Sequence, residues 1–133
     1  MIELRDIHKA YGPLEVLKGV SLAARRGQVV SLIGSSGSGK STLLRCANLL
    51  EDSQSGEVVF NGEPVRWKGS AMSRRPADHA QVTRIRTNLS MVFQQFNLWS
   101  HMTILQNVME APVTVLGRDR AEAEASARRY LEK

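Results

Sequence analysis

The sequence is poor in cysteine and has no long apolar run. Its one cysteine, Cys46, cannot form an internal disulfide, and we interpret it as a small buried residue. No run approaches the roughly 18 apolar residues of a membrane span, and the first ten residues, MIELRDIHKA, lack the apolar core of a secretory signal. We therefore expect neither a disulfide framework nor a membrane span, but one cytoplasmic domain with a real core.

Basic residues outnumber acidic ones, and the excess lies in the second half of the chain. Residues 1–65 hold seven Lys/Arg and seven Asp/Glu, whereas residues 66–133 hold eleven and six. Within 66–86, six basic residues stand against Asp78 alone: Arg66, Lys68, Arg74, Arg75, Arg84 and Arg86. A nucleic-acid footprint is one interpretation. A solvated insertion is favoured, because no aromatic residue interleaves the arginines after Trp67 to stack on bases. We expect no nucleic-acid partner.

The segment Gly34–Ser41, GSSGSGKS, matches the phosphate-binding pattern G-x-x-x-x-G-K-[ST] at every specified position. Its three glycines let the backbone curl closely round an anion, and the helix after the loop offers its N-terminus to the same anion. Lys40 supplies a charge for the outer phosphates, and the Ser41 hydroxyl is placed to bind the Mg²⁺ of a nucleoside triphosphate. The expected nucleotide contacts are Gly34, Ser35, Ser36, Gly37, Ser38, Gly39, Lys40, Ser41 and Thr42.

The flanks of this loop decide between a phosphate site and a flexible Gly/Ser linker. Gln28–Ile33 (QVVSLI) is β-branched and apolar, which predicts a buried strand of a parallel sheet. After Ser41, apolar residues recur at helical spacing. Strand, loop and helix in this order favour an NTPase. A small GTPase is disfavoured, because the sequence has no N-K-x-D guanine motif.

The remaining segments predict short strands first and helices later. Residues 2–22 alternate around a turn at 11–13 and predict an antiparallel pair, and Glu57–Phe60 ends at Asn61-Gly62, a hairpin signal along which Val65 and Trp67 return. Residues 68–79 predict a loop, 80–88 a helix, 89–93 a strand and 94–101 another loop.

Two capping signals predict the C-terminal helices. Thr103 is placed as the N-cap of a helix that Pro112 kinks or ends. Asp119 and Glu122 have the spacing of a capping box, and they open a last helix in which Glu124 pairs with Arg128. One face of that helix is predicted to carry Ala123, Ala127, Tyr130 and Leu131.

Taken together, GSSGSGKST, SGEVVFNG and MVFQQFNLWSHMTILQNV resemble the N-terminal part of an ATP-binding cassette (ABC) ATPase. More narrowly, they resemble the ATP-binding subunit of importers for polar amino acids of the histidine, arginine and octopine type. The resemblance implies an α/β fold with a P-loop NTPase core, in which 28–50 form the P-loop strand and helix. Residues 1–27 and 57–67 would form an antiparallel β subdomain. Residues 94–133 would hold the glutamine loop and the start of a helical subdomain.

The resemblance also implies roles for residues outside the loop. Tyr11 matches the aromatic residue that stacks on adenine; the alternative is a tyrosine that packs a strand end. Gln94 matches the glutamine that reaches Mg²⁺ and the attacking water, so Ser41 and Gln94 are the expected metal ligands; Gln95 is the competitor for that role. The region 94–109 would meet the permease subunits, although its apolar side chains are equally suited to a core.

The sequence departs from the family pattern beyond the helical region. An LSGGQ-like signature, a strand ending in Asp-Glu and a histidine switch are not in these 133 residues. We therefore expect a truncated cassette that binds ATP and Mg²⁺ without turnover, because phosphoryl transfer to water also needs a positioned nucleophile. The resemblance implies a second ATPase subunit and a place on the inner face of the cell membrane. A nucleic-acid-linked ABC ATPase and a non-catalytic nucleotide-binding module are the alternatives.

A truncated cassette would also lack strands that normally cover its central sheet. We expect the apolar faces of Val29, Leu32 and Leu43 to be partly uncovered.

Overall fold

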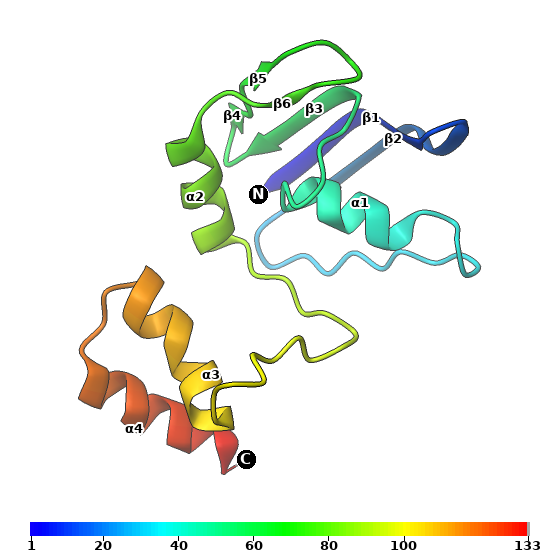
Figure 1. The fold of residues 1–133 in the computed structure, drawn as a ribbon. Helices are drawn as coiled ribbons and strands as arrows, with labels where there is room; N and C mark the ends of the chain where they lie inside the picture. Colours follow the sequence, from blue (N-terminus) through cyan, green and yellow to red (C-terminus); the bar gives the residue numbers. More distant parts are fainter. Residues whose placement is uncertain (133) are drawn as a thin grey trace. The chain divides into compact units, whose positions relative to one another are not determined.

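The computed structural model describes residues 1–132, which divide into two compact units, 1–90 and 91 onward (Figure 1). The strands and helices of the first unit are β1 (Ile2–Tyr11), β2 (Leu14–Ala24), α1 (Lys40–Ala47), β3 (Ser55–Phe60), β4 (Glu63–Pro64), β5 (Trp67–Lys68), β6 (Arg75–Pro76) and α2 (His79–Asn88). Those of the second unit are α3 (Ile104–Glu110), the π-helical turn η1 (Ala111–Val115) and α4 (Arg120–Leu131).

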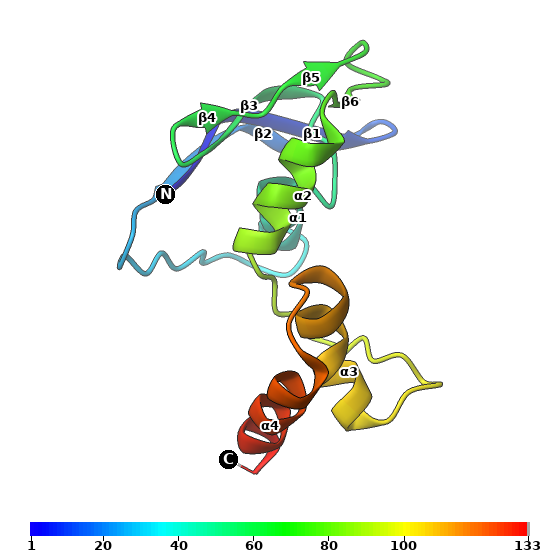
Figure 2. The ribbon, with the colours of Figure 1, turned by 90° about the vertical axis from the view of Figure 1, so that its left-hand side faces the viewer.

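The first unit is built on an antiparallel sheet of strand order β2-β1-β3-β4. The predicted antiparallel pair is confirmed as β1 and β2, and β3 adds to the other edge of β1. Helices α1 and α2 cover one face of this sheet (Figures 1 and 2). The residues buried between the sheet and the helices form one cluster: Leu4, Ile7, Leu17, Leu43, Cys46, Leu49, Val58, Val65, Val82 and Ile85.

Two predicted strands are wrong in this structure. Residues 28–33 form no strand among the described residues, and Val29 and Ile33 are 91% and 95% exposed. Residues 89–93 likewise form no strand there, with Val92 95% exposed. A buried parallel strand needs neighbours on its edges to bind its N–H and C=O groups, and neither segment has one in the described chain. The expected uncovered face is found at Val29, whereas Leu32 is half-buried against the core and Leu43 is buried.

The Asn61-Gly62 hairpin is confirmed, and the segment after it differs from the prediction. Strand β4 returns along β3 for two residues only, through the pairs of Val59 with Pro64 and Phe60 with Glu63. Trp67 leaves this sheet and pairs with Pro76, so β5 and β6 form a second small sheet inside the predicted loop 68–79. The Arg74 guanidinium lies 4.3 Å from the centre of the Trp67 ring and donates to Gly56 O at 2.6 Å.

The predicted helices form, with boundaries set by their caps. Thr103 caps α3 in a reciprocal capping box with Gln106, and Asp119 accepts from the backbone N–H groups of Ala121 and Glu122 at the start of α4. The α-helix α3 ends at Glu110, two residues before Pro112, and the chain continues as the π-helical turn η1. No helix among the described residues is long and apolar enough to cross a membrane.

The packed face of α4 is only partly as predicted. Ala123 and Ala127 are buried against Met109, and Glu124 pairs with Arg128 at 2.7 Å. Tyr130 and Leu131 are 59% and 47% exposed, so the apolar contact ends one turn earlier than the spacing predicts.

Two glycines with left-handed backbone test how tightly the sheet is built. Gly56 (φ +89°) opens β3 so close to β1 that an added Cβ would lie 2.6 Å from Arg5 O, whereas Gly62 (φ +84°) has open space. We expect Gly62→Ala to lower the free energy of unfolding by about 1 kcal/mol, through backbone strain alone. Gly56→Ala should lower it by about 3 kcal/mol, because the sheet must also open. Urea unfolding of both variants measures the difference, and equal losses would contradict the close approach of β1 and β3.

Candidate functional site

The loop before α1 has the backbone that its glycines are needed for. Gly37 and Gly39 have φ of +80° and +89°, in the left-handed region that side chains disfavour. Gly39 is also packed, since an added Cβ would lie 3.0 Å from Val16 Cγ1 and from Leu17 Cδ2 on β2. A Cβ on Gly34 would lie 2.7 Å from Ser38 Oγ. The loop is therefore closed tightly on itself and seated on the sheet.

Lys40 ties the two ends of this loop together. Its Nζ donates to Gly34 O at 2.7 Å, to Ser35 O at 2.6 Å and to Ser38 Oγ at 3.3 Å. These are hydrogen bonds from a full positive charge, which are the stronger kind. The ammonium group is thereby held against the carbonyls at the start of the loop.

The N-terminus of α1 is left open toward the loop. No side chain among the described residues caps it, and its first turn carries no acidic residue. The N–H groups at the start of a helix have no partner within the helix, and the helix dipole makes this end positive. Ser41 is exposed and Thr42 is half-buried in the same turn. The arrangement therefore suits a phosphate, with two hydroxyls beside it.

The rest of α1 is anchored so that this end points in a fixed direction. Leu43 and Cys46 are buried in the core beneath the sheet. At the other end of the helix, Arg86 of α2 donates to Leu49 O at 2.5 Å and to Asn48 O at 3.4 Å. A cation at these carbonyls is also favoured by the helix dipole. Sequence reasoning did not assign this role to Arg86, which it grouped with the solvated basic residues.

Tyr11 lies in the same unit as the loop, at the end of β1. Its hydroxyl donates to the carboxylate of Glu51, and the Lys9 ammonium lies 5.2 Å from the centre of its ring. The pKa of Tyr11 is raised, mainly by burial and by the bond to Glu51, against an opposing contribution from the Thr42 hydroxyl on α1. Tyr11 is 44% exposed, and its role as a platform for adenine or as a packing residue at the strand end stays a prediction.

Gln94 belongs to the second unit, and its side chain is exposed. The shared Mg²⁺ site of Ser41 and Gln94 therefore stays a prediction. After Gln94, Phe96 is 91% exposed and Trp99 is 51% exposed, so the core interpretation of this segment is not what the described residues show. Leu98 is 54% exposed.

Asn107 fixes the shape of the loop between Gln94 and α3, which the sequence did not reveal. Its Oδ1 accepts from the backbone N–H of Trp99 at 2.8 Å, and its Nδ2 donates to the carbonyls of Trp99, Met102 and Thr103 at 3.0–3.3 Å. An asparagine in the interior of a short helix is the one signal that points to such a role.

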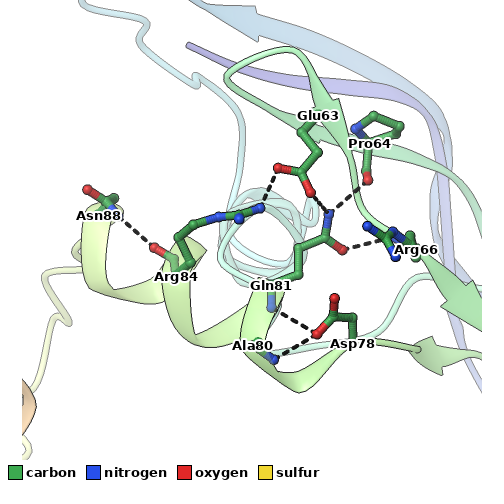
Figure 3. A network of polar contacts seen from close by, with 8 residues as sticks. All are labelled: Glu63, Pro64, Arg66, Asp78, Ala80, Gln81, Arg84 and Asn88. Carbon is green, nitrogen blue, oxygen red and sulfur yellow. Dashed lines mark hydrogen bonds and ion pairs between the residues drawn. The ribbon is translucent and has the colours of Figure 1, made fainter.

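Three of the six basic side chains of the segment 66–86 make contacts within the chain, namely those of Arg74, Arg84 and Arg86, so the segment is more than the predicted solvated insertion. Figure 3 shows the network around Gln81, which is 2% exposed. Its amide accepts from Arg66 N at 3.0 Å and donates to Glu63 Oε1 at 2.8 Å and to Pro64 O at 3.0 Å. Arg84 pairs with Glu63 and, as the largest cause, lowers the pKa of that carboxyl. Asp78 caps α2 through Ala80 N and Gln81 N.

The loop, the anchored helix and the sheet place the fold in the P-loop NTPase class, and the ABC transporter family model matches residues 17–133. The chain belongs to the ABC transporter family.

Curated relatives agree with this assignment. The chain is 56% identical over 133 residues to the arginine/ornithine transport ATP-binding protein AotP of Pseudomonas aeruginosa, in a match that covers 99% of the chain and 52% of the relative. It is 56% identical to the octopine permease ATP-binding protein P of Rhizobium radiobacter, with 99% and 51% covered. The chain thus spans about half the length of the curated relatives it matches.

Solved structures show the same fold. The dimeric structure of MJ0796, a bacterial ABC transporter cassette, matches with a TM-score of 0.77 and 34% identity over 99% of this chain and 55% of that one. A post-hydrolysis state of MJ0796 bound to ADP and Pi matches with a TM-score of 0.79 and 31% identity, over 99% of this chain and 56% of that one. The predicted α/β cassette fold is confirmed.

The packing of α1 can be tested through Cys46, the one thiol in the chain. Cys46 is 1% exposed, and burial raises the pKa of its thiol from 9.0 to about 11. At pH 8 the thiolate is therefore about a hundredfold scarcer than in an ordinary cysteine. We expect iodoacetamide to label the native chain at pH 8 at least a hundredfold more slowly than the chain in concentrated urea. Similar rates in both conditions would show that α1 does not pack as described.

Proposed function

We propose that this chain supplies the phosphate-binding part of an ATP-binding subunit in an ABC importer for polar and basic amino acids. The observation that carries the proposal is the uncapped N-terminus of α1 together with the Lys40 ammonium, which is hydrogen-bonded to the loop that precedes this helix. The names of the relatives support the setting, since they are transport ATP-binding proteins for arginine, ornithine and octopine. The bound ADP and Pi of the related cassette support the nucleotide.

The residues of the loop fit the phosphates of ATP. Gly37 and Gly39 take the left-handed backbone that lets the loop curl round an anion. The N–H groups of the first turn of α1 would bind the phosphate oxygens. When ATP binds, the Lys40 ammonium, which the loop already holds in place, would exchange its bonds to Gly34 O and Ser35 O for bonds to phosphate oxygens. Tyr11 would present the exposed part of its ring to the adenine.

Mg²⁺, when bound with ATP, would screen the charge of the outer phosphates. The Ser41 hydroxyl on the first turn of α1 and the amide oxygen of Gln94 would bind it, since hard cations prefer oxygen ligands. These residues would hold and orient the triphosphate without activating a water molecule. We propose that the chain on its own binds ATP without turning it over.

The same proposal places the chain beside membrane subunits. The region 94–109 would meet the permease, with Phe96 and Trp99 as exposed aromatic contacts. A second ATPase subunit would complete the assembly, as the dimeric form of the related cassette suggests. The chain would then lie at the inner face of the membrane through its partners.

Replacing Lys40 tests the nucleotide site. We expect Lys40→Ala to weaken binding of Mg-ATP by about 10- to 100-fold, because one charge-assisted hydrogen bond is worth about 1.5–3 kcal/mol. Lys68→Ala removes an exposed lysine on β5 and is the matched control, which should bind as the unchanged chain does. Calorimetric titration gives both affinities, and the melting temperature shows whether Lys40→Ala is folded. Equal affinity in a folded Lys40→Ala variant would contradict the proposed site.

Replacing the exposed aromatic residues tests the proposed permease contact. We expect Phe96→Ala and Trp99→Ala each to weaken capture by the permease subunits of a polar amino-acid importer about tenfold, since aromatic side chains often dominate interfaces. Leu116→Ala, also exposed but outside 94–109, is the control and should leave capture unchanged. Capture that is equally strong for all three variants would place the permease contact elsewhere.

A further inference from the structure

Glu51 lies just beyond α1 and is tied to that helix. Its backbone N–H donates to Arg45 O at 3.2 Å, and Leu50 N donates to the same carbonyl at 2.8 Å. The Glu51 side chain folds back so that Oε1 lies 3.4 Å from Arg45 Nη1. The position of this carboxylate is therefore set by α1, the helix whose other end forms the phosphate cradle.

The other carboxylate oxygen of Glu51 reaches across to β1. It accepts the hydroxyl of Tyr11 and lies 4.0 Å from Lys9 Nζ. The Glu51 side chain is only 20% exposed, so these contacts are partly sheltered from water. Lys9 is itself held, because its Nζ donates to Asp52 O at 2.7 Å. A single carboxylate thus joins the end of β1 to the end of α1.

The contact with Glu51 fixes the rotamer of Tyr11, on which the stacking of its ring depends. A half-exposed tyrosine at a strand end is otherwise free to change rotamer, and stacking on a base requires one orientation of the ring. With its hydroxyl on Glu51 and the Lys9 ammonium near its ring, Tyr11 is oriented before any ligand arrives. A side chain that is already ordered loses less entropy on binding, so affinity rises.

We propose that Glu51 is a positioning residue that holds the Tyr11 ring at a fixed place relative to the phosphate loop. This inference rests on the proposed function, since it takes Tyr11 as the platform for adenine. Glu51 acts on the nucleoside part of the ligand through Tyr11, and it does not touch the phosphates. Loss of Glu51 should therefore cost affinity for ATP while affinity for a bare triphosphate is retained.

The test compares Mg-ATP with magnesium tripolyphosphate by calorimetric titration of the full chain. Glu51→Ala should bind Mg-ATP about five- to tenfold more weakly than the unchanged chain and bind tripolyphosphate equally well. Tyr11→Phe, which keeps the ring and removes the hydroxyl, should show the same pattern. In the double variant the loss should be no larger than in either single variant, because both remove the same hydrogen bond.

Two further variants keep the test decisive. Glu57→Ala removes a carboxylate that pairs with Arg5 on the surface, and it should bind both ligands as the unchanged chain does. Glu51→Gln retains an oxygen that accepts from Tyr11, and it should recover most of the affinity for ATP. If Glu51→Ala does not fold, Glu51→Gln takes its place in the test. In that case, a larger loss of affinity for tripolyphosphate than for ATP in Glu51→Gln overturns the inference.

The outcomes separate this inference from the proposed function. If the unchanged chain binds neither ATP nor tripolyphosphate, the proposed function fails and the inference fails with it. If the chain binds ATP and Glu51→Ala binds it equally well, only the inference is overturned. If Glu51→Ala loses affinity for ATP and for tripolyphosphate to the same extent, Glu51 supports the fold in general and does not position Tyr11. The same conclusion follows if the losses of ATP affinity in Glu51→Ala and Tyr11→Phe add in the double variant.

Discussion

The structure of the first unit depends on a helix end that is left open. Most helices in proteins have their first N–H groups bound by a side chain, and α1 has no such cap among the described residues. Gly39, in a left-handed conformation, brings the loop over this end, and Lys40 holds the loop closed by its own carbonyls. The unsatisfied N–H groups and the ammonium thus belong to the same segment of loop and helix. An anion is the ligand that satisfies both.

The rest of the unit keeps that helix end in place. The sheet β2-β1-β3-β4 supports α1 from one side, and Val16 and Leu17 on β2 leave no room for a side chain at position 39. Arg86 holds the C-terminal end of α1 from α2. The network of Gln81 and Glu63 joins α2 to the strand region, so the basic segment 66–86 also serves to brace the site (Figure 3).

The sequence predicted those features that depend on near neighbours in the chain. The phosphate loop, the Asn61-Gly62 turn and the caps at Thr103 and Asp119 are set by residues close to one another in the chain, and all of these turns and caps form as expected. The strands predicted at 28–33 and 89–93 do not form, because a strand also needs a neighbour that no local pattern supplies.

In the site too, the local features could be predicted from the sequence and the long-range contacts could not. The loop residues follow from a motif, whereas the bond from Tyr11 to Glu51 joins residues 40 positions apart, and the contacts of Arg86 join α2 to the end of α1. Nothing in the sequence near Glu51 marks it as a partner of Tyr11. Long-range polar contacts of this kind follow from the folded arrangement and become visible only in the structure.

The central claim, that an anion binds at the open end of α1, is tested most directly by amide hydrogen exchange with and without Mg-ATP. The account predicts that the amides of residues 37–42 exchange at least tenfold more slowly with the nucleotide, because they become donors to phosphate oxygens. The amides of α4, in the other unit, should exchange at their former rates. Unchanged exchange over 37–42 in the presence of saturating Mg-ATP would contradict the account.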